Sequence, residues 1–217
     1  LHFFDPDTGR DEFFVQPEDG RPENRGNDGK PDPAGNMWQG TMPMVQDKVG
    51  GLYRIAPDGS SRCVIDGLGC ANGLGWSPDG KTMYFIDTPS RAVWAFDYDE
   101  KAGEIDLNSR RTVVDFTGFA PEEGGPDGMT VDAEGKLWVA QWGGCRVCRY
   151  DEITGEKLMQ VDVPAPCTTC PTFGGEKLDK LFITTAGFGK EKFPEAGSLF
   201  VADVGVCGRK ANRFGRE

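Results

Sequence analysis

A two-part unit that recurs along the chain is the feature that most restricts its fold. The first part is a glycine-containing turn followed by an aromatic-bearing strand, and it occurs at 32–42 (DPAGNMWQGTM), 77–88, 132–142 and, more loosely, 173–186. The second part is another predicted strand, and it follows at 50–59, 91–99, 145–155 and 197–205. Residues 1–9 resemble the second part without the first. A chain of this kind is expected to build a series of similar small sheets.

The spacing of the repeat favours a β-propeller. Its aromatic anchors Trp38, Tyr84, Trp138 and Phe182 recur every 44 to 54 residues, close to the ~40–50 residues of a propeller blade. Each period has room for about two further strands, which would complete a four-stranded blade. We expect an all-β propeller that forms a single domain over 1–217, with about four and a half blades. A β-sandwich and a solenoid are the alternative folds.

The composition excludes several classes of partner. The 31 glycines and 15 prolines separate short apolar runs, as in a β protein. A formal net charge of -11 repels nucleic acid and anionic membranes. No apolar run reaches the roughly 18–20 residues of a membrane span, and the first residues do not resemble a secretion signal. The seven cysteines are an odd number, which argues against a closed disulfide framework and indicates a reducing, cytoplasmic location.

Four of the cysteines have the spacing of a zinc site. Cys145 and Cys148 form one Cys-x2-Cys pair, and Cys167 and Cys170 form another about 18 residues later, as in four-cysteine zinc sites. The surrounding sequence CRVCRYD alternates like a strand, however, and residues three apart in a strand point to opposite faces. We therefore favour half-buried thiols over zinc.

Three polar corners recur in phase with the repeat, and they are the candidate site. Asn27, Asn72 and Asp127 each directly precede Gly or Asp-Gly, and glycine would let the backbone turn sharply enough to aim the preceding side chain. Each dipeptide alone is an ordinary turn signal, but equivalent positions in successive blades converge on the propeller axis. The only histidine is His2, so oxygen ligands for a hard cation such as Ca²⁺, Mg²⁺ or Mn²⁺ are expected instead of histidine chemistry.

At these residues the sequence resembles the gluconolactonase/regucalcin-like family of senescence-marker-protein-30 type. The resemblance runs through RPENRGNDGKPDPAGNMWQGTM, ANGLGWSPDGKTMYFIDT, PDGMTVDAEGKLWVAQWGG and LFITTA. It implies a six-bladed propeller that hydrolyses a sugar lactone with one divalent cation, Ca²⁺, Zn²⁺, Mn²⁺ or Mg²⁺. Because the chain begins in the middle of a repeat, we expect roughly the first one to two blades of such a ring to be missing.

The resemblance also implies roles for individual residues. Asn72 and Asp127 match metal ligands of the family, and Asp127 matches its candidate general base. Arg25 and Asn27 match its substrate-binding pair. Cys170 stands where members of the family often have a cysteine, which further disfavours the zinc site.

The sequence departs from the family pattern at three places. The family's third metal ligand is a glutamate in the first blade, and no part of this chain matches that region, because Glu12 and Glu23 lie in segments that match a later blade. Gly26 replaces a bulky aromatic residue, and Val45 replaces a glutamate that some animal members use for substrate. A non-catalytic calcium-binding propeller, or an inactive fragment that lacks one ligand, is therefore the alternative to a lactonase, and phosphotriester hydrolysis is a third possibility.

Overall fold

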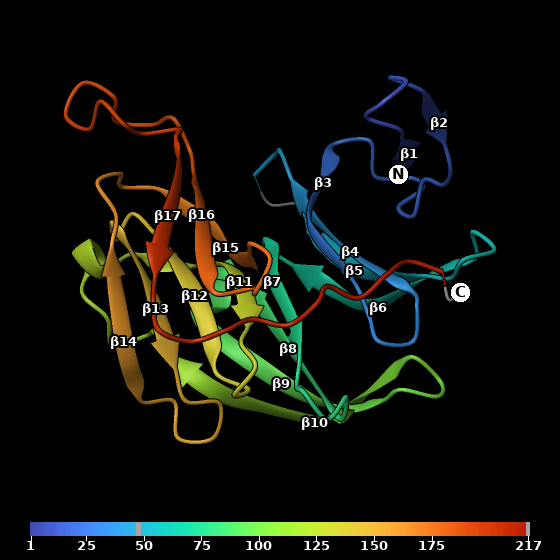
Figure 1. Cartoon of the computed structure of the whole chain (residues 1–217). Helices are drawn as coiled ribbons and strands as arrows, with labels where there is room; N and C mark the ends of the chain where they lie inside the picture. Colours follow the sequence, from blue (N-terminus) through green and yellow to red (C-terminus); the bar gives the residue numbers. More distant parts are fainter. Residues whose placement is uncertain (47–48, 216–217) are drawn as a thin grey trace.

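Four antiparallel β-sheets follow one another along the chain in the computed structural model, which describes residues 1–46 and 49–215 (Figure 1). Each sheet is a meander in which sequential strands are neighbours. The first contains β3 (Asn24–Pro31), β4 (Met37–Pro43), β5 (Gly50–Ile55) and β6 (Ser61–Leu68), and the second β7 (Ala71–Trp76), β8 (Thr82–Asp87), β9 (Ala92–Asp99) and β10 (Glu104–Asp115). The third contains β11 (Gly125–Val131), β12 (Leu137–Trp142), β13 (Arg146–Tyr150) and β14 (Lys157–Asp162), and the fourth β15 (Thr168–Gly174), β16 (Lys180–Thr185) and β17 (Leu199–Asp203).

The remaining elements are small. A separate hairpin of β1 (His2–Phe4) and β2 (Asp11–Phe13) precedes the first sheet. Two short 3-10 helices, η1 (Thr88–Ser90) and η2 (Pro121–Glu123), lie in connections within and after the second sheet. No helix within residues 1–46 and 49–215 is both long and apolar enough to cross a membrane.

The arrangement confirms the prediction of an all-β propeller. The first part of the repeat forms β4, β8, β12 and β16, and the second part forms β5, β9, β13 and β17. The predicted room for two more strands per period is filled in the first three sheets, and three strands of the fourth lie in the described residues. The first strands of the sheets, β3, β7, β11 and β15, contact one another in that order, and we call them the inner strands.

The hydrophobic core lies between neighbouring sheets, in three clusters. Trp38, Leu74 and Phe85 belong to the cluster between the first and second sheets. The second cluster, which includes Met129 and Tyr150, lies between the second and third sheets, and the third lies between the third and fourth. The second and third sheets therefore contribute apolar side chains to a cluster on either side, and the first and fourth sheets each contribute to one cluster, as expected for stacked blades.

A buried aspartate holds the turn between the first two strands of the first and third sheets. Asp132 Oδ1 accepts hydrogen bonds from the backbone N–H groups of Glu134 and Lys136, both at 2.9 Å. Its Oδ2 accepts from Trp138 Nε1 at 3.0 Å and from Arg149 Nε at 2.8 Å. Asp32 makes the equivalent bond to Trp38 Nε1 at 2.8 Å. The repeated D-x-x-G-x-x-W sequence thus joins the hairpin turn to the aromatic anchor of the blade.

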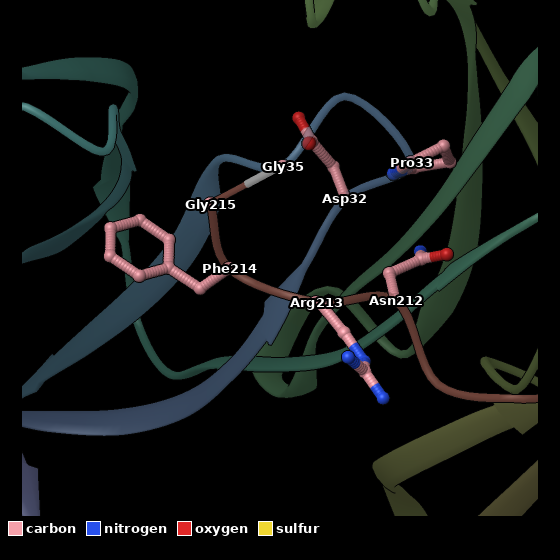
Figure 2. Close-up of a pocket in the computed structure, with 7 residues that line it drawn as sticks. All are labelled: Asp32, Pro33, Gly35, Asn212, Arg213, Phe214 and Gly215. Carbon is pink, nitrogen blue, oxygen red and sulfur yellow. The ribbon is translucent and has the colours of Figure 1, made fainter. Parts of the chain in front are cut away.

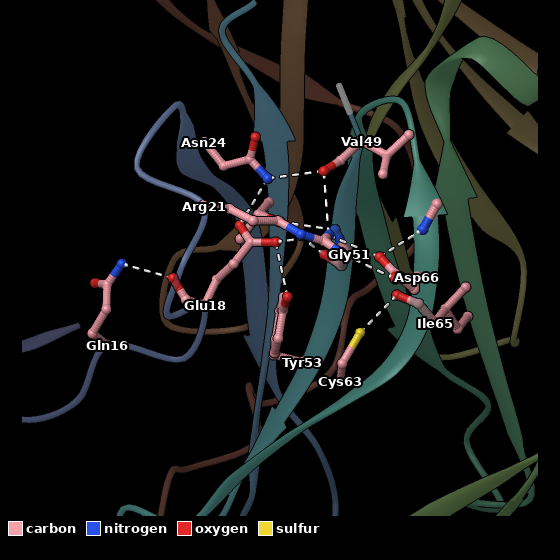
Figure 3. Close-up of polar contacts among 12 residues, drawn as sticks. Gln16, Glu18, Arg21, Asn24, Val49, Gly51, Tyr53, Cys63, Ile65 and Asp66 are labelled. Atoms are coloured by element: carbon pink, nitrogen blue, oxygen red, sulfur yellow. Dashed lines mark hydrogen bonds and ion pairs between the residues drawn. The ribbon is translucent and has the colours of Figure 1, made fainter. Parts of the chain in front are cut away.

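A polar network attaches the segment before β3 to the first sheet (Figure 3). The carboxylate of Glu18, which is 5% exposed, accepts hydrogen bonds from Tyr53 Oη at 2.8 Å and Asn24 Nδ2 at 3.0 Å. Arg21 pairs with Asp66 through two hydrogen bonds, at 2.8 and 3.0 Å. Burial and the bond to Glu18 raise the pKa of Tyr53, so the phenol remains the donor in this network.

The segment after β17 crosses the turns of all four sheets. Gly208 N donates to Leu178 O, and Cys207 O accepts from Ala133 N. Farther along, the Arg209 guanidinium lies 3.4 Å from Trp76 O and 3.3 Å from Pro78 O, and Asn212 Nδ2 donates to Pro31 O at 3.1 Å. Figure 2 shows residues 212–215 lying beside the turn that contains Asp32 and Gly35. This segment, residues 204–215, therefore acts as a strap across the sheets.

We predict that Asp132→Ala destabilises the fold by about 3–5 kcal/mol, because it leaves the Arg149 guanidinium and the Trp138 N–H without their buried acceptor. The measurement is the free energy of unfolding in urea. Asp79→Ala is the matched control, since Asp79 occupies an exposed turn of the second sheet and bonds Ser77 Oγ and Lys81 N within that turn. Equal losses in the two variants would contradict the anchoring role of Asp132.

Candidate functional site

The four residues singled out in the sequence line one cleft of about 590 Å³ at one end of the inner strands. Arg25 and Asn27 come from β3, Asn72 from β7 and Asp127 from β11. The other lining residues are Asp28, Met42, Cys70, Thr88, Gly128, Trp142, Thr169, Cys170 and Phe188. The predicted convergence of equivalent positions is therefore present in the structure.

The converging side chains lie at irregularities of the inner strands. The register of β3 against β4 shifts between Gly26 and Gly29, and that of β7 against β8 shifts between Asn72 and Leu74. A third shift separates Pro126 from Met129 in β11. β-Bulges redirect side chains and end regular pairing, so each inner strand turns a polar side chain toward the same cleft.

The sequence-based expectation of sharp glycine turns at these corners is wrong. Asn27, Asn72 and Asp127 lie within strands, and Gly73 and Gly128 are absent from the described glycines with positive φ. Glycine is needed there because neighbouring strands approach closely. A β carbon on Gly73 would lie 2.8 Å from Asp127 O, and one on Gly128 would lie 2.5 Å from Thr169 O. The glycines therefore allow close contact between inner strands instead of a change of chain direction.

Asp127 is a carboxyl group with an unusually high pKa. Burial, together with the negative charge of Asp28, raises its pKa to about 7, although interactions with the Asn72 side chain and the Gly128 N–H oppose the shift. A carboxyl group with a pKa near neutrality can both accept and release a proton at physiological pH. Asp127 is thus suited to proton transfer.

Asp28 is a second carboxyl group of the cleft, and the sequence analysis did not select it. Burial raises its pKa, and the nearby Lys30 ammonium and the Gly29 N–H oppose this effect. The Gly29 N–H donates to Asp28 Oδ1 at 2.8 Å, whereas Oδ2 is buried and has no hydrogen-bond partner among the described residues. In the sequence, the feature that could have identified Asp28 is its position next to Asn27 in the same polar corner.

A threonine hydroxyl orients the Asn72 amide. Asn72 Nδ2 donates to Thr88 Oγ1 at 3.1 Å, and Thr88 Oγ1 donates to Pro126 O at 2.9 Å. The chain of bonds connects β7 to β11 through the first residue of η1. The sequence analysis did not select Thr88, because no neighbouring residue in the sequence indicates that its side chain lines the cleft.

Arg25 and Asn27 are held as a pair. Arg25 Nη1 donates to Asn27 Oδ1 at 2.9 Å and to Gly26 O at 2.8 Å. Asn27 Nδ2 in turn donates to Ala71 O at 2.9 Å, which joins β3 to the neighbouring inner strand β7. The remaining guanidinium donors can contact a ligand in the cleft.

The residues of the cleft match an oxygen-preferring cation in chemistry. Asn72 and Asp127 offer amide and carboxylate oxygens, which are typical ligands of Ca²⁺ and Mg²⁺. Asp28, whose Oδ2 has no hydrogen-bond partner among the described residues, is a second acidic group, and its negative charge repels that of Asp127. A divalent cation would relieve this repulsion. Within the described residues no group of three or more His, Cys, Asp or Glu is arranged to hold a metal.

The cysteines with zinc-like spacing have other surroundings. Cys148 is buried in the core, and its Sγ donates to Gln141 Oε1 at 2.9 Å. Cys170 lines the cleft, where burial raises its pKa to about 12. All seven cysteines are free thiols.

Comparison with known proteins shows that the chain matches one protein family. The family model described as "SMP-30/Gluconolactonase/LRE-like region" matches residues 1–187. Human regucalcin is 43% identical over 197 residues, an alignment that covers 85% of this chain and 64% of the human protein. The chain thus spans less than two thirds of that relative's length.

Two solved structures show the same fold. A calcium-binding protein, regucalcin, from Agrobacterium tumefaciens superposes with a TM-score of 0.90 at 31% identity, covering 99% of this chain and 73% of that one. A gluconolactonase from Xanthomonas campestris superposes with a TM-score of 0.68 at 29% identity, covering 84% of this chain and 61% of that one.

We predict that Gly128→Ala destabilises the protein by about 1–3 kcal/mol, because its β carbon would force β11 away from β15. The measurement is again urea unfolding. Gly118→Ala is the control, since a β carbon there would have no neighbour within 4 Å. A Gly128→Ala variant as stable as Gly118→Ala would contradict the close-approach explanation.

Asp28→Asn should raise the thermal midpoint of chelator-treated protein by roughly 2–4 °C, equivalent to about 1 kcal/mol in a chain of this size. The neutral amide avoids burying an unpartnered charge. The same variant should gain less stability from added Ca²⁺ than the parent chain does, because one acidic group is lost. Calorimetric scans with and without Ca²⁺ measure both effects, and Asp7→Asn, in the exposed turn of the first hairpin, is the control. If Ca²⁺ raised the thermal midpoint of the variant and of the parent chain equally, Asp28 would take no part in cation binding.

Proposed function

The chain belongs to the SMP-30/gluconolactonase/regucalcin family, and on this premise we propose that it is a carboxylic ester hydrolase that opens a sugar lactone with the help of one divalent cation. The observation that carries the proposal is that Asp127, a half-buried carboxyl group whose pKa is raised to about 7, lies in one cleft with Arg25, Asn27 and Asn72. A cation held by Asn72 and Asp127 would supply polarisation of the lactone carbonyl.

Asp127 is the general base of the proposed reaction. It takes a proton from the attacking water as the oxygen of that water bonds to the carbonyl carbon, and the ring C–O bond then breaks. The proton passes to the ring oxygen, so that the product is an open-chain hydroxy acid. Proton transfer uses the Asp127 oxygen that the cation does not bind, because a bound cation lowers the basicity of the oxygen that it contacts.

Arg25 and Asn27 bind and orient the substrate. Their mutual hydrogen bond at 2.9 Å fixes the guanidinium before substrate arrives, which reduces the loss of side-chain freedom on binding. Guanidinium N–H groups donate to the hydroxyl or carbonyl oxygens of the lactone. The bond from Asn27 to Ala71 O keeps this pair in place relative to Asn72 on the next strand.

Asp127→Asn should lower lactone-dependent acid release by about 10²- to 10⁴-fold, the usual contribution of a general base. The assay follows proton release from glucono-δ-lactone above the spontaneous rate, with Ca²⁺, Zn²⁺, Mn²⁺ or Mg²⁺ added in turn. Asp106→Asn, at an exposed position of β10, is the control and should retain full activity. Full activity in Asp127→Asn would remove this residue from the mechanism.

The alternative function is that of a non-catalytic calcium-binding propeller, and the Agrobacterium regucalcin is a calcium-binding protein. Tight Ca²⁺ binding by calorimetry without turnover of any lactone would support that function instead. The cytoplasmic location and the single domain over 1–217 remain predictions.

A further inference from the structure

The cleft has a polar side and an apolar wall. The wall consists of Trp142 and Phe188, with Met42 and the thiols of Cys70 and Cys170 beside them. The indole and phenyl rings are in edge contact, with centroids 5.8 Å apart. Trp142 is 40% exposed and Phe188 is 65% exposed, so two large aromatic side chains face solvent at the opening of the cleft. Neither residue belongs to the proton-transfer or substrate-orienting groups proposed above.

Both aromatic residues are held by well-anchored backbone. Trp142 ends β12, where it pairs with Gly125 on β11, two residues before Asp127, and it also bridges to Cys167. Phe188 lies in the connection between β16 and β17. That connection is fixed because Ala196 is buried and Phe193 packs against the core cluster of the third and fourth sheets.

Part of the hydrogen-bonding capacity of the polar side is already used within the protein. Asn27 Nδ2 and Asn72 Nδ2 each donate a hydrogen bond to another group of the protein. Thr88 Oγ1 accepts one hydrogen bond, from Asn72, and donates another, to Pro126 O. The hydroxyl of Thr169 pairs with that of Thr184 at 2.6 Å. A polyhydroxylated ring requires a partner for each hydroxyl that it buries, and the wall of Trp142, Phe188 and Met42 offers none.

We propose that Trp142 and Phe188 form a subsite for an apolar substituent, an alkyl chain or aryl group, on the ring of the lactone. This inference deepens the proposed function and rests on it for turnover, while the binding at the subsite does not require turnover. The polar side takes the ester group of the ring, and the substituent covers the two exposed aromatic rings and removes their apolar surface from water.

The test compares lactones that differ only in the substituent. The 217-residue chain is assayed with a δ-lactone bearing a pentyl chain, with unsubstituted δ-valerolactone and with glucono-δ-lactone. We expect kcat/KM to be at least about tenfold higher for the pentyl lactone than for δ-valerolactone, since each methylene in a hydrophobic pocket contributes roughly tenfold or more. In Trp142→Ala and Phe188→Ala this preference should fall about tenfold, with the δ-valerolactone rate within about twofold of the parent.

Two further variants control for structural effects. Phe4→Ala removes a phenyl ring that is also 65% exposed but lies in the first hairpin, and it should leave the preference unchanged. Trp142→Phe keeps an aromatic surface and should retain most of the preference. Equal kcat/KM for pentyl lactone and δ-valerolactone, or a preference that survives both alanine substitutions, would overturn the subsite and leave the proposed function intact.

A binding experiment separates the subsite from catalysis. The pentyl δ-lactam resists hydrolysis, and calorimetry should show it binding at least tenfold more tightly than the unsubstituted δ-lactam, with the difference lost in Trp142→Ala. This result without hydrolysis of any lactone would support the subsite and reject the proposed function. Equal binding of the two lactams, or no binding of either, would overturn the subsite.

Discussion

The structure depends on how closely the inner strands of the sheets approach one another. At Gly73 and Gly128 the adjacent strand leaves no space for a β carbon, so the neighbouring strands are nearly in backbone contact. This closeness brings bulges on separate strands to one cleft, and it places the carboxyl groups of Asp28 and Asp127 near enough for their charges to interact. The raised pKa of Asp127 and the shape of the cleft both follow from the packing of these strands.

Lys30 holds three of the inner strands together. It belongs to β3, and its ammonium group donates to Leu74 O on β7 and to Met129 O on β11, both at 2.9 Å. Hydrogen bonds from a charged donor are stronger than those between neutral groups, and these two bonds satisfy carbonyl groups on two neighbouring inner strands. The same positive charge opposes the rise that burial causes in the pKa of Asp28, so Lys30 connects the packing of the strands to the electrostatics of the cleft.

The sequence predicted the convergence of Asn27, Asn72 and Asp127 because a regular repeat places equivalent residues at equivalent positions around an axis. It could not distinguish bulges from turns, since a glycine required for close approach has the same sequence signature as one with positive φ. The sequence also did not predict that Trp142 and Phe188 line the cleft. Their contact depends on the path of the connection between β16 and β17, which follows tertiary packing rather than any local pattern.

The strap at residues 204–215 has a consequence for folding kinetics. The hydrogen bond between Asn212 and Pro31 O joins residues 181 positions apart, and Arg209 reaches back 133 positions to Trp76. Contacts of such long sequence separation form slowly, because most of the intervening chain must first be ordered. The strap is therefore expected to dock last, after the sheets have formed, and its release would be an early step of unfolding that loosens the turns of all four sheets together.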